Sequence, residues 1–515
     1  MKRLITFLLC VLLLVGSGTV AFAADAPGTD IPTIYVLGSG SGLVVREPDG
    51  SKRQVYGFNL PDDFIATTAK ENLDVFKRAF FTQKWDEFCV VLRDIIVPIF
   101  AEIKLDENGE APNGSVVDWE WSRETLDGSK VGGKYPTYRY HFMYDFRMDP
   151  YKTAEILHAY IEDVLAVTGE TKVNLVGRCL GACITAAYME KYDGQYVDDY
   201  LLYCGALYGA TQCSKAFCGE LYLESGGVER FVYDLDLFAD EVLRDLLQAG
   251  VTLLRKTYGL DIACWAVNNV YRQIYLNIVP PIVIDTYGSF PGYWSMVADC
   301  DYEKAKQTVF YGADMEKYAN FIRIIDNYHY NVQVKTPELF RHYQDKGIGI
   351  ANIVKYGFQT FPVTRQSDML SDQICAVKDA SFGAVTSTIN GTLSKKYLKT
   401  ADMRYVSPDH QIDASTCMLP DRTWFIKDLK HDNFPECVER LFDHILNNDA
   451  TVFDSEEYPQ YMVYDRETES IAPQTAENCD TTARYRHTFF EALRRFWKAV
   501  IALIRRQIES KRSAA

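Results

Sequence analysis

One short stretch of the chain places a nucleophilic side chain between two glycines. Residues 177–181 read Gly-Arg-Cys-Leu-Gly; a mostly apolar run typical of a buried strand precedes them, and small and apolar residues that suit a buried helix follow. A sharp strand-to-helix turn of this kind lifts its central side chain, here Cys179, to the helix N-terminus, where the helix dipole favours negative charge. The pattern predicts a thiolate nucleophile. The alternative is a buried structural cysteine on a glycine-rich turn.

An activated thiol needs a base within hydrogen-bond reach and a group that orients this base. Of the eight histidines, His431 alone follows a late strand-like run and opens a helix, so we predict it as the base. A nucleophile on such a turn is followed along the chain first by the acid and then by the histidine. Asp409 is the first choice for the acid, with Asp413 and Asp368 as alternatives, since a single aspartate in a loop is often a turn former.

A glycine-rich turn, Gly-Ser-Gly-Ser-Gly at residues 38–42, follows the strand-like run 33–37. A phosphate-binding loop would need further residues that this stretch lacks, such as the lysine of a P-loop. Upstream of a nucleophilic turn, its amides can supply half of an oxyanion hole, and the residue after the nucleophile supplies the other half. We therefore expect Ser39 and Leu180 to donate their N–H groups. A tight turn without this role is the alternative.

The order of strand-like and helix-like runs predicts an α/β fold with a doubly wound, mostly parallel sheet. A large helical insertion would cap the sheet and shape an apolar pocket over Cys179, and an amphipathic helix would end the chain. The expected organisation is a signal peptide (1–23), a first core part (24–209), a helical cap (210–347), a second core part (348–464), a polar linker (465–483) and a basic amphipathic helix (484–515).

Composition narrows the class of protein. The chain of 515 residues is 48% apolar and 24% charged, as in folded globular proteins, and its net charge of −16 argues against nucleic-acid binding. Lys2 and Arg3, the apolar run 4–15 and an Ala-x-Ala site at 21–23 form a signal peptide, so the protein is expected to be secreted or associated with the cell surface. The 13 cysteines are scattered and show no metal-binding spacing, so neither a metal nor another cofactor is expected.

The C-terminal segment reverses the sign of the charge. Residues 484–512 contain nine basic and two acidic side chains. Apolar residues recur there on one helical face, at spacings of three and four: Phe489, Leu493, Phe496, Trp497, Val500, Ile504 and Ile508. Such a helix suits an anionic membrane surface, and docking on the acidic body of the protein itself is the equal alternative. The uncharged run is too short to span a bilayer.

Several of these motifs together resemble a known superfamily. The Val-Asn-Leu-Val-Gly strand at 173–177, the cysteine turn, the Tyr-Asp-Phe-Arg sequence at 144–147 and the late Asp-to-His spacing resemble the α/β-hydrolases. The nearest likeness, over about residues 33–447, is to the lipases and acyltransferases similar to lecithin–cholesterol acyltransferase. The resemblance implies ester hydrolysis or acyl transfer on a small-molecule ester or lipid-like substrate. That family normally carries serine where this chain has Cys179, whereas dienelactone hydrolases and polyhydroxyalkanoate synthases resemble this chain in using cysteine.

The leading interpretation is an exported hydrolase or acyltransferase with a Cys179–His431–Asp409 triad and a thioester intermediate. One alternative is a binding or surface protein that keeps the fold without the chemistry. Another is a thiol redox sensor, in which Cys183, one helical turn after Cys179, would be the resolving cysteine. The distance between the Cys179 sulfur and the His431 ring separates the first interpretation from the others.

Overall fold

A central sheet with flanking helices organises the computed structural model of this protein. The expected signal peptide and Ser39 lie outside the described residues. The structure describes residues 31–38, 43–55, 67, 71–117, 139–235, 240–448, 450–479 and 482–513.

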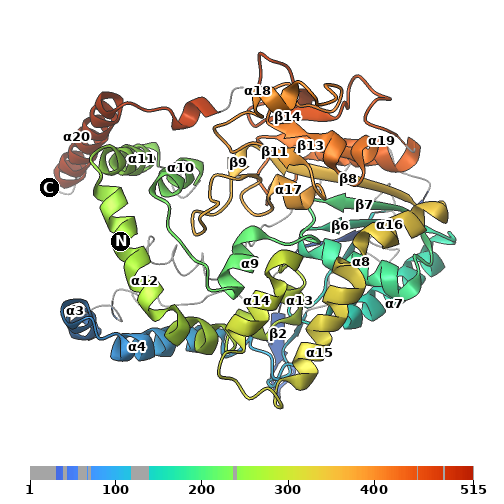
Figure 1. Ribbon diagram of the computed structural model, residues 1–515, viewed down its shortest axis with the longest axis horizontal. Helices are drawn as coiled ribbons and strands as arrows, with labels where there is room; N and C mark the ends of the chain where they lie inside the picture. The colour runs from blue at the N-terminus through green and yellow to red at the C-terminus, as the bar shows by residue number, and fades with distance from the viewer. Residues whose placement is uncertain are drawn as a thin grey trace.

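The central sheet has eight strands in the order β15-β14-β13-β8-β7-β6-β1-β5 (Figure 1). Neighbouring strands are parallel except β14 and β15, which pair antiparallel. The protein is therefore a mixed α/β protein with a mostly parallel sheet, as the sequence predicted. The strands are β1 (Thr33–Val36), β5 (Arg139–Phe142), β6 (Val173–Arg178), β7 (Val197–Tyr203), β8 (Gly349–Tyr356), β13 (Thr423–Lys427), β14 (Tyr461–Asp465) and β15 (Ser470–Pro473).

Both faces of the sheet are buried, which explains why the inner strands read as continuous apolar runs. Side chains of β7 alternate: Tyr200 and Leu202 enter the larger core, whereas Leu201 and Tyr203 enter the smaller one. Helices α7 (Pro150–Thr168) and α8 (Leu180–Tyr192) cover the first face, and α19 (Glu436–Asn448) covers the second. Because the helices cover both faces of the sheet, the candidate site lies at the ends of strands, after β6 and β13.

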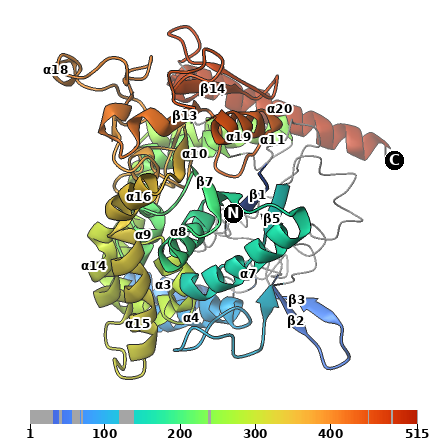
Figure 2. The same ribbon diagram turned by 90° about the vertical axis from the view of Figure 1, so that its right-hand side faces the viewer.

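The stretch between β7 and β8 is helical, as expected. Part of it packs beside α8 and β8, and the rest runs to one edge of the molecule, where α11 meets α20 (Figures 1 and 2). None of the described helices is long and apolar enough to cross a bilayer. The helices of this stretch are α9 (Thr211–Phe217), α10 (Ser225–Asp234), α11 (Glu241–Lys256), α12 (Gly259–Val283), α13 (Pro291–Trp294), α14 (Asp299–Val309), α15 (Ala319–Tyr328) and α16 (Thr336–Asp345).

Shorter elements complete the described chain. A small sheet near the N-terminus pairs β2 with β3 and β4, and helix α4 packs against α12 with α3 beside it. These elements are β2 (Leu43–Arg46), β3 (Lys52–Gln54), β4 (Val116–Val117), α3 (Leu73–Thr82), α4 (Asp86–Ile96), β9 (Phe358–Gln359), β10 (Leu370–Ser371), α17 (Val377–Ala380), β11 (Val385–Thr386), α18 (Lys395–Leu398), β12 (Ile412–Asp413) and α20 (Phe489–Ser513).

The prediction of a polar linker at residues 465–483 is wrong for part of that segment. Ser470–Pro473 forms β15, the edge strand of the central sheet, and the carbonyl of Cys479 accepts a hydrogen bond from the buried Lys427 ammonium at 2.7 Å. An edge strand exposes one side to water and can be polar. Its composition therefore resembles that of a linker, and only the pairing with β14 distinguishes the two.

The glycine after the nucleophilic turn permits close contact between helix α8 and strand β1. A Cβ atom at Gly181 would lie 2.1 Å from the carbonyl oxygen of Val36 and 2.5 Å from that of Leu37, both main-chain atoms. No side chain fits there unless the helix moves away from the strand. The glycine therefore sets the depth at which α8, and with it Cys179, lies in the fold.

Replacing Gly181 with alanine should lower the free energy of unfolding by about 3 kcal/mol, because the helix must shift to admit a methyl group. Gly250 in α11 is the matched control, since its added Cβ would meet only Phe496 Cε2, at 3.9 Å. Gly250→Ala should raise stability by about 1 kcal/mol through helix propensity. Urea unfolding of both variants measures the difference; equal stability would contradict the close contact.

Candidate active site

Cys179 occupies a strained position between strand β6 and helix α8. Its φ of 53° and ψ of −122° are rare for a side-chain-bearing residue, so the surrounding structure must hold this conformation. The Cys179 amide donates to the carbonyl of Tyr203 at 3.3 Å, and the Cys179 carbonyl accepts from the amides of Ala182 and Ala206 at 3.1 and 3.0 Å. These bonds tie the turn to the neighbouring strand and to the helix, and they direct the thiol out of the sheet.

Cys179 and His431, which the sequence analysis expected to meet, lie side by side in the structure. The two side chains are hydrogen-bonded to each other, although strands β7, β8 and β13 of the sheet lie between them in the chain. His431 lies after β13, in the turn before α19, where the sequence analysis placed it. The two parallel strands β6 and β13 therefore end at the same edge of the sheet and bring the thiol and the imidazole together.

The acid that orients His431 is Asp372. Its Oδ2 atom lies 2.7 Å from His431 Nδ1, and the His431 amide donates to the Asp372 carbonyl at 3.0 Å. Its Oδ1 atom accepts from the amides of Ile374 and Cys375, at 3.0 and 2.7 Å. The carboxylate side chain is only 1% exposed, so every contact that stabilises its charge comes from the protein. The arrangement Cys–His–Asp is complete at this point of the sheet.

The prediction of Asp409 as the orienting acid is wrong. Asp409 forms a buried ion pair with Lys427, at 2.7 Å, and accepts hydrogen bonds from Ser407 Oγ and Gln474 Nε2 at 2.6 and 2.9 Å. Lys427 belongs to β13, and its side chain points to Asp409 on one side of the strand while His431 follows the strand's end. The pair is a structural element of the core.

The two alternative acids are also wrong. Asp413 accepts from the Tyr397 hydroxyl at 2.8 Å and caps the turn at Ser415, and Asp368 lies in the loop before β10. Asp372, four residues after Asp368, follows the two-residue strand β10. That strand is too short to show a periodicity in the sequence, so no local signal distinguished Asp372 from its neighbours.

Two cations that the sequence analysis missed hold the histidine turn. The buried Lys355 ammonium, on strand β8, donates to the carbonyls of Lys430, His431 and Asn433 at 2.8, 2.8 and 2.9 Å. Arg178, the residue before the nucleophile, donates from Nη2 to the His431 carbonyl at 3.0 Å. Burial lowers the pKa of Lys355. Both residues bind main-chain oxygens, so they position His431 without touching its ring.

The charges of the triad favour an ionised pair. Burial opposes ionisation of Cys179, but the charge and hydrogen bond of His431, with the Leu180 amide, outweigh it and lower the pKa of the thiol. Burial likewise opposes protonation of His431, yet Asp372 and the thiolate raise its pKa to about 9. The pKa of Asp372 is lowered, against burial, by His431. All three shifts therefore favour the charged forms of the triad, a thiolate, an imidazolium and a carboxylate, over the neutral ones.

This pair predicts a characteristic pH dependence. Because the pKa of Cys179 is lowered, its alkylation by iodoacetamide should already be fast at neutral pH, and His431→Gln should move the inflection up towards the ordinary thiol value of about 8.5. Because the pKa of His431 is raised to about 9, turnover of an alkyl ester should fall above that pH, where the leaving alkoxide loses its proton donor. The rate of alkylation at Cys179, followed by peptide mapping, measures the titration of the thiol. The rate of ester hydrolysis measures that of His431. An unshifted alkylation profile in His431→Gln would contradict the pair.

Two groups were expected to form an oxyanion hole: the Leu180 amide and the glycine-rich turn after β1. The described part of each lies next to the Cys179 thiol. The Leu180 amide donates to the Cys179 sulfur, and the turn after β1 passes so close that a Cβ at Gly38 would lie 3.5 Å from it. The Tyr144 hydroxyl holds this turn by donating to the Leu37 carbonyl at 2.8 Å. The donation expected from Ser39 falls outside the described residues. The role of the Leu180 amide stays a prediction.

Other cysteines near the triad are neutral thiols. Cys183, Cys204 and Cys375 carry free thiols. Cys183 donates to the Ser295 carbonyl at 3.6 Å, and burial raises its pKa to about 12, so it is a poor resolving thiol for Cys179. Cys375 donates to the Cys204 carbonyl at 3.5 Å, and burial raises its pKa well above the usual value.

One group of side chains could in principle hold a metal ion. The ligand atoms of Asp372, Cys375 and His431 lie within 4.8 Å of one another. The Asp372 carboxylate, however, already accepts from two amides and from the His431 ring, and the Cys375 thiol is protonated and donating. These commitments fit a hydrogen-bonded triad better than a coordination shell.

Comparison with known proteins adds no family to this description. No protein-family model matches the chain, and no curated protein sequence is significantly similar to it.

Proposed function

We propose that this protein is an exported hydrolase or acyltransferase that cleaves esters through a covalent thioester on Cys179. The observation that carries the proposal is the hydrogen-bonded series Cys179, His431 and Asp372. Its first member, Cys179, occupies a strained strand-to-helix turn. A nucleophile, a base that activates it and an acid that orients the base are the parts that acyl transfer requires.

The order of these residues supports membership of the α/β-hydrolase superfamily. Nucleophile, acid and histidine follow one another along the chain as Cys179, Asp372 and His431, which is the order of triads built on this type of turn. The parallel sheet and the helical stretch between β7 and β8 agree with such a fold. The helical stretch would then cover the site and select the substrate.

The reaction proceeds in two steps. The Cys179 thiolate attacks the ester carbonyl and forms a tetrahedral oxyanion, which the Leu180 amide and the turn after β1 stabilise. The oxyanion collapses to a thioester as the carbon–oxygen bond breaks, and the His431 imidazolium gives its proton to the leaving alcohol. His431, now neutral, takes a proton from water or from an acceptor alcohol, which attacks the thioester and releases the thiolate and the acid or new ester.

Trapping the acyl-enzyme tests this function. A brief reaction with a panel of aryl esters of acetic to decanoic acid should add the mass of one acyl group to the protein, on the peptide that contains Cys179. Hydroxylamine should remove it, as expected for a thioester. Failure of every ester to acylate Cys179, while the same protein is alkylated there, would favour a binding protein that keeps the fold without the chemistry.

A further inference from the structure

The described residues of the protein cover one face of helix α20. Ala492 and Ala499 are buried, and Phe496 packs over Gly250 of helix α11. Arg495 donates to Asp245 at 2.7 Å and to Gln248 at 3.0 Å, and Arg506 pairs with Asp240. Docking on the acidic body of the protein, one of the two predicted roles of this segment, is therefore confirmed for this face.

The opposite face of α20 carries an exposed apolar stripe. Phe490 is 79% exposed and Trp497 is 55% exposed, although burial would be favourable for both. The stripe continues to the end of the helix, at the spacings of three, four and seven that keep residues on one face. Its members are Phe490, Trp497, Ile501, Ile504 and Ile508.

Basic side chains run along this stripe. Arg494, Lys498 and Arg505 are exposed, each one turn or less from a member of the stripe. In the part of the chain that the structure describes, no acidic group lies within ion-pair distance of any of the three, in contrast to Arg495 and Arg506 on the docked face. Apolar anchors flanked by unpaired cations are the pattern of a helix that lies in an anionic lipid interface.

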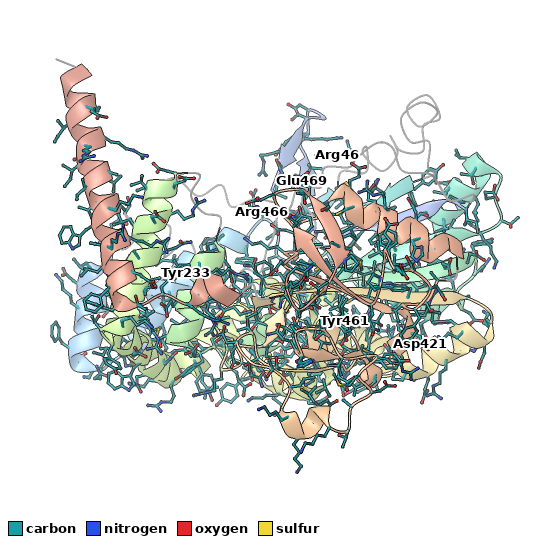
Figure 3. The ribbon with its side chains drawn as sticks, turned by 90° about the horizontal axis from the view of Figure 1, so that it is seen from above. Arg46, Tyr233, Asp421, Tyr461, Arg466 and Glu469 are labelled. Atoms are coloured by element: carbon teal, nitrogen blue, oxygen red, sulfur yellow. The ribbon has the colours of Figure 1, made fainter. Side chains whose placement is uncertain are left out.

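Other exposed apolar side chains lie on the same edge of the molecule. Helices α20, α11 and α12 adjoin one another there (Figure 1), and α12 exposes Ile262 and Trp265, the latter by 68%. Figure 3 shows α20 rising from the region of the labelled Tyr233, its outer side chains directed away from the rest of the molecule and its far end beyond α11. A large, flat partner such as a membrane surface can therefore reach the stripe.

Charge decides between the candidate occupants of the stripe. A second copy docked face to face would bring Arg494, Lys498 and Arg505 of the two chains together, and the remainder of each chain is strongly acidic. An anionic bilayer surface instead attracts these three cations and accepts the apolar side chains between its headgroups.

We propose that the outer face of α20 binds the surface of anionic phospholipid membranes, with the stripe inserted at the level of the headgroups. The inference does not depend on the proposed catalytic function. It commits the helix to lying on the membrane, since its charged residues recur every turn and no described helix could span a bilayer.

Vesicle flotation tests the proposal. Protein that begins at Ala24, the expected mature N-terminus, is mixed with vesicles of phosphatidylcholine alone or of phosphatidylcholine with the anionic lipid phosphatidylglycerol. We expect flotation with the anionic vesicles, weakened by salt, and at least about tenfold weaker binding for the double variant Ile501→Glu/Ile504→Glu.

Two controls separate this surface from general effects. Val167→Glu introduces one glutamate at an exposed aliphatic residue of helix α7, far from α20 in the chain, and should leave flotation unchanged. Arg494→Glu/Lys498→Glu should abolish the preference for anionic vesicles while the melting temperature stays the same, because both side chains are exposed and neither forms an ion pair with a described residue. Flotation of the isoleucine variant equal to wild type would overturn the proposal. The proposal would also fail if the wild-type protein bound no vesicles but formed a dimer, and if Ile501→Glu/Ile504→Glu dissociated that dimer. The occupant of the stripe would then be a second copy.

Discussion

Replacing Cys179 with alanine is expected to reduce ester turnover by about 10⁴-fold or more, because no other group at the site can form the acyl intermediate. His431→Ala should have an effect of similar size, since the imidazole both stabilises the thiolate and protonates the leaving group. The double variant should be no worse than either single variant, because residues that act as one unit are not additive. Steady-state hydrolysis of the ester that acylates the protein fastest provides the measurement.

The exposed Cys300 offers the matched control for this experiment. Cys300→Ala removes a thiol that any alkylating or acylating reagent can reach, and it should leave turnover unchanged. Circular dichroism should show the same fold for the Cys179, His431 and Cys300 variants, and only His431→Ala should melt at a lower temperature, because it leaves the buried Asp372 carboxylate without its partner. Turnover in Cys179→Ala at the wild-type rate would show that the ester is cleaved elsewhere, and the proposed nucleophile would be lost.

The second large effect separates two buried aspartates. Asp372→Asn should lower kcat by about 10⁴-fold, because an amide in that place favours the wrong tautomer of His431 and removes the charge that raises its pKa. The His431 limb of the pH profile should move to lower pH in this variant, since the folded pKa is no longer raised by the carboxylate. Only a group that acts on the His431 ring would change both quantities together.

Asp409→Asn should behave in the opposite way. This substitution leaves the Lys427 ammonium, 2% exposed, without its counter-charge, so the free energy of unfolding should fall by about 3 kcal/mol while kcat of the folded protein is retained. Urea unfolding and steady-state kinetics of both asparagine variants distinguish the two roles. Loss of turnover in Asp409→Asn, with Asp372→Asn active, would reverse the assignment of the acid.

The contrast between Asp372 and Asp409 shows which part of the site the sequence could predict. Asp409 has the features of an orienting acid when the chain is read in order, since it precedes strand β13 and His431 follows that strand. Its actual partner, Lys427, lies on the strand itself with its side chain directed to the other side. Alternation along a strand decides the direction of each side chain, but which neighbour it meets depends on the packing of a distant loop.

The amino-acid sequence by itself determined the parallel sheet, the cysteine turn and the histidine that meets it. Each depends on local features: apolar runs of strand length, two glycines that allow a close approach, and a histidine between a late strand and the helix that follows it. Such signals lie within about ten residues and can be recognised without a partner.

Only the tertiary structure decided the acid, the support of the histidine turn and the fate of the C-terminal helix. Asp372 and Lys355 come from segments far from His431 in the chain, and their roles follow from where β8 and β10 end. Apolar residues on α20 were assigned to one face, yet the helix packs Phe496 against α11 and exposes Ile501 and Ile504. Pairings between distant segments leave no periodicity in either segment, and so they become visible only when the chain is folded.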